Sequence, residues 1–218
     1  MSAVPFDVHR IGRGLPFAES VSALRKALRG GAAVVQAPPG TGKTTLVPPV
    51  VSNAVRENLV GASGADADPV TGRVVVVQPR RVAARAAARR LAALTVTEPG
   101  GVIGWSVRGE RRTSKATRVE FVTPGILLRR LLQNPELAGT AAVVLDEVHE
   151  RGVESDLLVG MLAELRQLRE DLVLVAMSAT VEAKRFAALL GGDAPAPVVD
   201  CPSALHPLTV EWLSLIHI

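Results

Sequence analysis

Residues 32–45 read AAVVQAPPGTGKTT. The first five residues, Ala32–Gln36, are small, β-branched or amide-bearing and predict a buried strand, and a helical pattern begins at Lys43. Gly40 and Gly42 lie between the two elements. A glycine-rich turn that joins a strand to a helix presents backbone N–H groups and the positive end of the helix dipole to an anion. The stretch therefore predicts a phosphate-binding loop in an α/β domain.

The residue types in this loop suit a nucleoside triphosphate. Lys43 would bring a point charge to the β- and γ-phosphates, and Thr44 a hydroxyl for Mg²⁺. Ala37 stands where the usual pattern has glycine, but it is small enough to permit close approach of the phosphates. The predicted nucleotide-binding residues of the loop are Ala37, Pro38, Pro39, Gly40, Thr41, Gly42, Lys43, Thr44 and Thr45.

Apolar runs alternate with helical patterns along the rest of the chain. The predicted strands are Ala32–Gln36, Arg73–Val77, Val119–Val122, Ala141–Leu145 and Leu172–Met177. The predicted helices are Ser20–Leu28, Lys43–Val55, Val82–Leu94, Gly125–Leu132, Ser155–Arg169 and Glu182–Leu190. Strands that are apolar throughout indicate a sheet buried on both faces. The fold class is therefore predicted to be α/β, with a mostly parallel central sheet and helices on both faces.

Length and composition limit the classes of protein to be considered. A chain of 218 residues fits one domain, or one domain and a fragment of a second. The lone cysteine, Cys201, excludes an internal disulfide framework and a cysteine-cluster metal site. The longest uncharged stretch, Gly30–Gly42, is too short to cross a membrane, and the N-terminus has no apolar signal region. We expect a cytoplasmic protein with no membrane partner. Surface breaks are predicted at Gly61–Gly72 and Asp193–Pro197.

Charge is distributed unevenly along the chain. The net charge of +4 is made up of +3 over residues 1–74, +9 over residues 75–131 and −8 over residues 132–218. Such asymmetry suggests a polyanionic partner for the basic segment. A solvated arginine-rich surface explains the same numbers, so charge alone leaves both interpretations open. Trp105 and Phe121, the aromatic residues of the basic segment, are predicted to be core residues.

An acidic pair follows the predicted strand Ala141–Leu145. The residues are Asp146, Glu147, Val148 and His149. A carboxylate at the carboxyl end of a central strand lies in the crevice where α/β sheets bind ligands. Asp146 could hold the hydration shell of Mg²⁺, and Glu147 could orient or deprotonate an attacking water. His149 is predicted to link this nucleotide site to a nucleic-acid side.

These motifs, taken in order, resemble those of the DEAH/DExH branch of superfamily 2 helicases. Residues 37–45 resemble motif I, residues 146–149 (DEVH) motif II and residues 178–180 (SAT) motif III. Residues 78–84 (QPRRVAA) resemble motif Ia, and residues 123–129 (TPGILLR) resemble motif Ib. The segment 104–108 with Ser114 and Thr117 matches the stretch that links the motifs in DEAH proteins. Residues 79–88 and 125–137 look most like bacterial HrpB-type helicases.

The resemblance implies a RecA-like P-loop domain and a role for each matching residue. It implies ATP and Mg²⁺ as cofactors, an NTP hydrolase of the EC 3.6.4 type, and single-stranded RNA (or DNA) as partner. Lys43, Asp146, Glu147 and His149 would be catalytic, with Thr44 and Asp146 at the metal. Arg80, Arg81, Thr123 and Gly125 would contact the strand, and Ser178 and Thr180 would couple hydrolysis to movement. Arg90 would stack on the nucleotide base, although a solvated arginine explains it equally well.

The chain departs from the family in its extent. Helicases of this kind clamp ATP between two RecA-like domains, whereas the motifs here end at Thr180. We expect a RecA-like domain over residues 1–200, and over residues 201–218 a linker or the start of a second domain that follows in cis. The chain alone should bind ATP and hydrolyse little. The alternatives are a natural single-domain protein, a non-catalytic nucleotide-binding or interaction module, and another P-loop ATPase. A transporter ATPase would carry an LSGGQ-like element, which this sequence lacks.

Overall fold

A mixed sheet organises the described part of the chain. The computed structural model describes residues 5–57, 72–179 and 182–201. The strands in these ranges are β1 (Ala32–Gln36), β2 (Arg73–Val77), β3 (Ile103–Val107), β4 (Glu110–Arg112), β5 (Val119–Val122), β6 (Thr140–Leu145), β7 (Val173–Ser178) and β8 (Val198–Asp200). Their order in the sheet is β4-β3-β5-β2-β6-β7-β1-β8. Strands β3 and β4 form an antiparallel hairpin, and the other neighbouring pairs are parallel.

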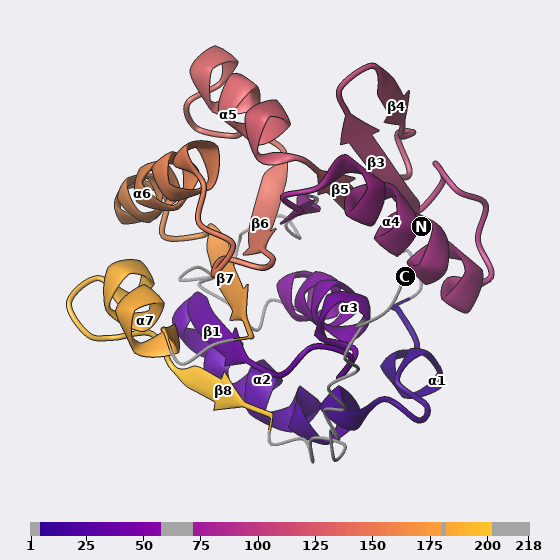
Figure 1. Ribbon diagram of the computed structural model, residues 1–218, viewed down its shortest axis with the longest axis horizontal. Helices are drawn as coiled ribbons and strands as arrows, with labels where there is room; N and C mark the ends of the chain where they lie inside the picture. The colour runs from indigo at the N-terminus through magenta and orange to yellow at the C-terminus, as the bar shows by residue number, and fades with distance from the viewer. Residues whose placement is uncertain (1–4, 58–71, 180–181, 202–218) are drawn as a thin grey trace, which may run out of the picture.

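Helices cover both faces of this sheet (Figure 1). The α-helices of the described ranges are α1 (Val8–Ile11), α2 (Val21–Ala27), α3 (Lys43–Arg56), α4 (Arg81–Thr95), α5 (Pro124–Gln133), α6 (Val153–Leu168) and α7 (Ala183–Gly191). Short 3-10 helices at Pro16–Ser20 and Leu28–Gly30 flank α2. Helices α1 to α4 lie on one face, and α5, α6 and α7 lie on the other.

The core consists of two apolar layers separated by the sheet. Successive side chains of a strand point to opposite faces, so each strand contributes to both layers. In β1, Val35 packs with the α1–α4 layer and Val34 with the α5–α7 layer. In β2, Val76 packs with the α1–α4 layer and Val75 with the α5–α7 layer. This double burial explains why the strands are apolar without alternation, as expected for a parallel sheet.

The parallel strands bring their carboxyl ends to one edge of the sheet. Strand β1 is followed there by the glycine-rich loop, β2 by Gln78 and Pro79, and β5 by Thr123. Strand β6 is followed by Asp146 and Glu147, and β7 by Ala179. Segments that are far apart in the sequence therefore meet along this carboxyl edge, where ligand sites of α/β sheets occur.

The predicted fold class is confirmed, and five strands were predicted within one residue at each end. Strands β3, β4 and β8 were not predicted. In β3 the pattern is interrupted by Gly104, which the structure requires because an added Cβ would lie 2.5 Å from the carbonyl oxygen of Arg112. A glycine within a strand weakens its sequence signal. Strands β4 and β8 are three residues each, too short for a periodic pattern.

Other expectations about the chain have mixed outcomes. Trp105 and Phe121 are core residues, 1% and 0% exposed. The break at Asp193–Pro197 is confirmed as the connection between α7 and β8. The predicted loop at Gly61–Gly72 lies, apart from Gly72, outside the described residues, and so does the segment after Cys201. Within the described residues, none of the helices has the length and apolar character needed to cross a bilayer.

Candidate active site

The glycine-rich loop has the backbone form that its sequence predicts. Gly40 and Gly42 have φ angles of 81° and 89°, in the left-handed region that glycine adopts without strain. Gly42 is the N-cap of α3. A Cβ at Gly42 would lie 2.8 Å from Cδ1 of Leu15, so glycine is also needed there for space. The hydroxyl of Thr41 donates to the carbonyl of Pro38 at 2.9 Å and closes the loop.

Lys43 joins this loop to the acidic pair. Its side chain is only 4% exposed, and Nζ lies 3.2 Å from Oε1 of Glu147. A buried ammonium needs a partner, because its charge is costly to remove from water. The backbone N–H of Ala37 donates to the carbonyl of Ser178 at 3.0 Å, which extends the β1–β7 pairing into the loop. The loop is therefore fixed against both β7 and the end of β6.

The carboxylate of Asp146 is held from three directions. Oδ2 accepts a hydrogen bond from the hydroxyl of Thr44 at 2.6 Å and another from the side-chain amide of Gln78. Oδ1 accepts from the backbone N–H of Glu147 at 2.9 Å. Burial raises the pKa of Asp146 to about 6, and the neighbouring Glu147 carboxylate adds to the increase. The Thr44 hydrogen bond and the Lys43 charge act in the opposite direction.

The same oxygens fit a magnesium ion. The Thr44 hydroxyl and the Asp146 carboxylate are hard oxygen donors, which Mg²⁺ prefers. Among the described residues, no group of three or more His, Cys, Asp and Glu side chains is placed to hold a metal. A small donor set is what Mg²⁺ needs when substrate phosphates and water complete its octahedron. A cation beside Asp146 would also favour the charged carboxylate that burial disfavours.

Glu147 adopts a strained backbone conformation at the centre of the site. Its φ is 53°, which is uncommon for a residue with a side chain and is found at functional sites. Its carboxylate lies between two side-chain nitrogens. The ammonium Nζ of Lys43 is 3.2 Å away, and the ring Nε2 of His149 is 3.3 Å away. The carboxylate therefore faces the glycine-rich loop rather than turning out to solvent.

His149 connects the acidic pair to β7. Its Nδ1 accepts a hydrogen bond of 3.3 Å from the backbone N–H of Ala179, the middle residue of the SAT segment. In the neutral ring the proton then lies on Nε2, the nitrogen that faces Glu147. Ser178 is fully buried in β7, and Thr180 lies outside the described residues. A side chain thus links residues 146–149 to residues 178–179. The predicted link from His149 to a nucleic-acid side stays a prediction.

A cavity of about 420 Å³ lies beside these residues, between the glycine-rich loop and α4. Thr44, Gln78, Arg80 and Glu147 contribute to its wall. Three alanines of α4, Ala83, Ala86 and Ala87, also line it. Arg90 is exposed and lies one helical turn beyond Ala86 and Ala87, on the same side of α4.

The residues predicted to contact a strand lie along the carboxyl edge. Arg80 is 73% exposed and forms an ion pair of 2.9 Å with Glu150, and Arg81 is exposed at the start of α4. Thr123 is the N-cap residue of α5. An added Cβ at Gly125 would lie 3.3 Å from both carboxylate oxygens of Glu154.

The contacts among the described residues join Lys43, Thr44, Asp146, Glu147 and His149 into one connected cluster. They do not extend to Arg90, Thr123 or Gly125. Those three residues therefore remain predictions of a site rather than members of the observed cluster.

Gln78 was missed as a site residue. It is 4% exposed, and its side-chain amide donates to the carboxylate of Asp146. Its own backbone N–H donates to the carbonyl of Val122 at 2.8 Å, so the side chain starts from a fixed position. The available signal was a polar residue directly after a buried strand, at the edge where the other motifs also end.

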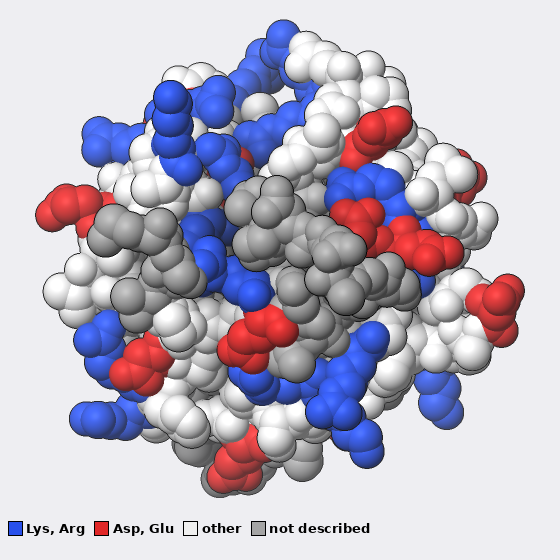
Figure 2. Space-filling view, turned by 180° about the vertical axis from the view of Figure 1, so that it is seen from behind, with Lys and Arg blue, Asp and Glu red and all other residues white. Residues whose placement is uncertain are grey.

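Basic side chains gather on one side of the molecule. In the view from behind, Lys and Arg concentrate at the upper left, the side that carries α4, β3 and β4 (Figure 2). On the right, acidic and basic side chains are interspersed. The +9 segment of the sequence is therefore also a basic region in space, next to the carboxyl edge through Arg80 and Arg81.

Most of the chain matches a known protein family. The family model described as DEAD/DEAH box helicase matches residues 20–189. The chain is 36% identical over 183 residues to "ATP-dependent RNA helicase HrpB" of Escherichia coli, covering 84% of this chain and 21% of that protein. It is 36% identical over 200 residues to "DExH-box ATP-dependent RNA helicase DExH3" of Arabidopsis thaliana, covering 91% of this chain and 16% of that protein.

Solved structures give the same result. The crystal structure of Escherichia coli DEAH/RHA helicase HrpB superposes with a TM-score of 0.73 at 35% sequence identity. The match covers 87% of this chain and 22% of that one. The chain thus spans about a fifth of the length of HrpB, and less of the plant relative.

Proposed function

This chain belongs to the DEAD/DEAH box helicase family, and we propose that it is the first motor domain of an ATP-dependent nucleic-acid helicase. The proposed domain binds ATP with Mg²⁺ and couples hydrolysis to movement along a single strand. The observation that carries the proposal is the convergence of Lys43 and Thr44 on Asp146 and Glu147. A glycine-rich strand–helix turn alone would not require these acidic partners.

The proposed chemistry follows from the position of each group. Lys43 and the N–H groups of the loop bind the phosphates, with the start of α3 directed at them. Thr44 and Asp146 hold Mg²⁺, which when bound neutralises charge on the transferring phosphoryl group. Glu147 orients the attacking water and accepts its proton. Phosphoryl transfer depends mainly on positioning and electrostatics, and both come from fixed elements here.

The nucleic-acid side of the proposal rests on the basic region. Arg80, Arg81, Thr123 and Gly125 follow β2 and β5 and would contact the backbone of a single strand. Such contacts are independent of base sequence and weaken with salt. The relatives above are named RNA helicases, so we propose RNA as the strand. Ser178, Thr180 and His149 would transmit hydrolysis to this side, and Arg90 would stack on the nucleotide base.

The proposed domain needs a second RecA-like domain for full activity. That domain would supply an arginine finger, which contributes roughly 10³–10⁵ in rate in related enzymes. The relatives are much longer than the region they share with this chain, which supports a second domain in cis. The 218-residue chain alone is therefore expected to bind ATP and to hydrolyse it very slowly.

Nucleotide binding by the purified chain tests the proposal. A fluorescent ATP analogue is titrated in the presence and absence of Mg²⁺, and single-stranded RNA binding is measured separately. Lys43→Ala should weaken nucleotide binding by tenfold or more, because it removes a charge-assisted phosphate contact. RNA binding should persist in this variant. Lys26→Ala, at an exposed position of α2, is the matched control.

Three results would contradict the proposal. Unchanged nucleotide affinity in Lys43→Ala would show that the loop is not the phosphate site. Rapid RNA-stimulated turnover by the 218-residue chain would show that a second domain is unnecessary. Absence of nucleotide binding in the wild-type chain would favour a non-catalytic interaction module.

A further inference from the structure

Gln78 lies opposite Asp146 at the point where their two strands end. The parallel register of β2 and β6 pairs Val77 with Leu145, so the next residues, Gln78 and Asp146, stand opposite each other. Opposite residues of a parallel pair direct their side chains to the same face of the sheet. The backbone N–H of Asp146 donates to the carbonyl of Val77 at 2.9 Å, which continues the pairing up to this position. The strand register therefore places an amide side chain next to the carboxylate.

The amide of Gln78 is held in place and directed at Asp146. Its residue is 4% exposed, and Nε2 donates a hydrogen bond to Oδ2 of Asp146. The backbone N–H of Gln78 donates to the carbonyl of Val122 at 2.8 Å, and Pro79 follows with a φ angle that its ring restricts. A buried side chain on a fixed backbone has few positions to choose from, so the hydrogen bond to Asp146 is formed in advance of any ligand.

The two side chains that donate to Oδ2 of Asp146 differ in what else they can do. The hydroxyl of Thr44 donates at 2.6 Å, but its oxygen is also a proposed ligand of Mg²⁺. The amide nitrogen of Gln78 is a donor only and cannot bind a metal through that atom. Its hydrogen bond favours the charged carboxylate, which is the form that binds a metal. Gln78 can therefore hold Asp146 without competing for the cation.

We propose that Gln78 is a positioning residue for the metal site beside the glycine-rich loop. Its amide fixes the orientation of the Asp146 carboxylate, so the carboxylate is set for Mg²⁺ before the nucleotide binds. Partners that orient a metal ligand in this way typically contribute about 10- to 100-fold in metal affinity. The contact should strengthen the binding of Mg²⁺ and have little effect on the phosphate contacts of Lys43 and the loop. This role rests on the proposed function, because it assigns Gln78 to the Mg²⁺–ATP site.

Nucleotide affinity of the 218-residue chain, measured with and without Mg²⁺, tests this role. A fluorescent ATP analogue is titrated in excess EDTA and again in excess Mg²⁺, and the ratio of the two dissociation constants is compared between variants. Gln78→Met keeps the length of the side chain and removes its donor. The ratio should fall about tenfold, as expected when a metal ligand loses an orienting partner. The affinity in EDTA should stay within about twofold of the wild type, because the phosphate contacts are unchanged.

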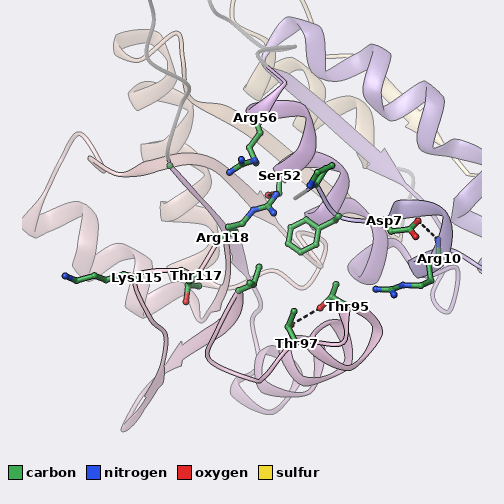
Figure 3. Close-up of a pocket in the computed structure, with 14 residues that line it drawn as sticks. Asp7, Arg10, Ser52, Arg56, Thr95, Thr97, Lys115, Thr117 and Arg118 are labelled. Atoms are coloured by element: carbon green, nitrogen blue, oxygen red, sulfur yellow. Dashed lines mark hydrogen bonds between the residues drawn. The ribbon is translucent and has the colours of Figure 1, made fainter. Parts of the chain in front are cut away.

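Two control variants separate positioning from a general loss of stability. Gln167→Met makes the same substitution at an exposed position of α6. Thr97→Val removes the 2.9 Å hydrogen bond between the hydroxyls of Thr95 and Thr97, in the wall of a cavity of about 660 Å³ (Figure 3). That cavity includes Arg56, the last residue of α3, and shares no described lining residue with the cavity beside the glycine-rich loop. Both controls should keep the wild-type ratio.

The outcomes distinguish this role from a structural one and from failure of the proposed function. A wild-type ratio in Gln78→Met overturns the positioning role and leaves the proposed function standing. Equal losses of affinity in EDTA and in Mg²⁺ also overturn it, because a structural defect weakens both. A wild-type chain without any effect of Mg²⁺ would contradict the proposed metal site itself. If circular dichroism shows that Gln78→Met is unfolded, Gln78→Asn replaces it, since its amide is one methylene shorter and should not reach Asp146.

Discussion

The hydroxyl of Thr44 donates a hydrogen bond of 2.6 Å to the carboxylate of Asp146, a residue 102 positions later in the chain. Thr44 belongs to the first turn of α3, and Asp146 follows β6, two strands away from β1 in the sheet. The contact therefore depends on the strand order β6-β7-β1, which places the two carboxyl ends on either side of β7. The hydrogen bond places the two proposed magnesium ligands, Thr44 and Asp146, next to each other.

The burial of Asp146 predicts a pH-dependent stability. Its pKa of about 6 lies above the ordinary value of about 3.9, so the folded state holds the proton more tightly than the unfolded state. The stabilising effect of protonation is fully present below pH 4 and is lost as the pH rises through 6. The loss should approach about 3 kcal/mol, since one pKa unit is about 1.4 kcal/mol.

Urea unfolding of the wild-type chain and of Asp146→Asn in metal-free buffer measures this effect. The variant does not titrate at this position, so its stability should lack the decrease between pH 4 and pH 6. Parallel stability curves for the two proteins across that range would show that Asp146 is not the group responsible.

The two glycines of the loop should differ in their tolerance of alanine. Both have positive φ, so each substitution carries a strain of about 1 kcal/mol. A Cβ at Gly40 meets no atom within 4 Å, whereas a Cβ at Gly42 meets the Leu15 side chain at 2.8 Å. Gly42→Ala should therefore cost about 1–2 kcal/mol more than Gly40→Ala, as expected for overpacking.

A double variant identifies the cause of that difference. Leu15→Ala removes the atoms that the new Cβ would meet, so Gly42→Ala should cost less in the Leu15→Ala chain than in the wild type. Free energies of unfolding from denaturant titration give the coupling between the two sites. Additive costs would mean that Leu15 does not restrict Gly42.

Glu147→Gln should separate nucleotide binding from hydrolysis. The amide keeps the volume of the side chain but cannot accept a proton from water. ATP affinity should change by no more than a few-fold, while the slow ATP hydrolysis that we propose for the chain should decrease about 100-fold or more. Single-turnover assays with radiolabelled ATP in protein excess measure both quantities. Glu150→Gln, which alters the neighbouring ion pair with Arg80, should retain hydrolysis.

The geometry of the glycine-rich loop and of the acidic pair could be predicted from sequence because short segments determine it. A strand, two glycines and a helix start fix the position of Lys43 and Thr44, and a buried strand places Asp146 at its carboxyl end. The parallel sheet then brings both segments to one edge. The local sequence pattern and the strand topology agree at these positions, so the pattern alone predicts where Lys43, Thr44 and Asp146 lie.

Other residues of the site depend on tertiary contacts that no local pattern records. Gln78 contacts Asp146 only because β2 is the neighbour of β6, and the sequence does not state strand order. Arg90 is the opposite case, since its family position predicts a role that the observed contacts neither include nor contradict.

Glu120 is a buried carboxylate in the otherwise apolar strand β5. It is fully buried in β5 and accepts hydrogen bonds from Arg130, at 3.0 and 2.5 Å, and from the Ser106 hydroxyl at 2.6 Å. Burial raises the pKa of Glu120, but the hydrogen bonds from Arg130 and Ser106 and the charges of Arg130 and Arg73 outweigh it and hold the pKa below its ordinary value. The carboxylate therefore stays charged in the core of the sheet.

Glu120→Gln should destabilise the chain by about 3 kcal/mol at pH 7, because it leaves Arg130 and Arg73 facing a neutral amide in a partly buried position. The more exposed pair of Arg85 and Glu110 supplies the control. Glu110→Gln should cost about 1 kcal/mol or less, since the amide oxygen can still accept from Trp105 and solvent screens the lost charge. Denaturant unfolding of both variants makes the comparison. The pKa of Glu120 is lowered in the folded state, so the stability that its carboxylate contributes is lost as the pH falls through that pKa. The free energies of unfolding of the wild type and of Glu120→Gln should therefore converge in acid. Equal costs at pH 7 would show that burial gives the Glu120 pair no special weight.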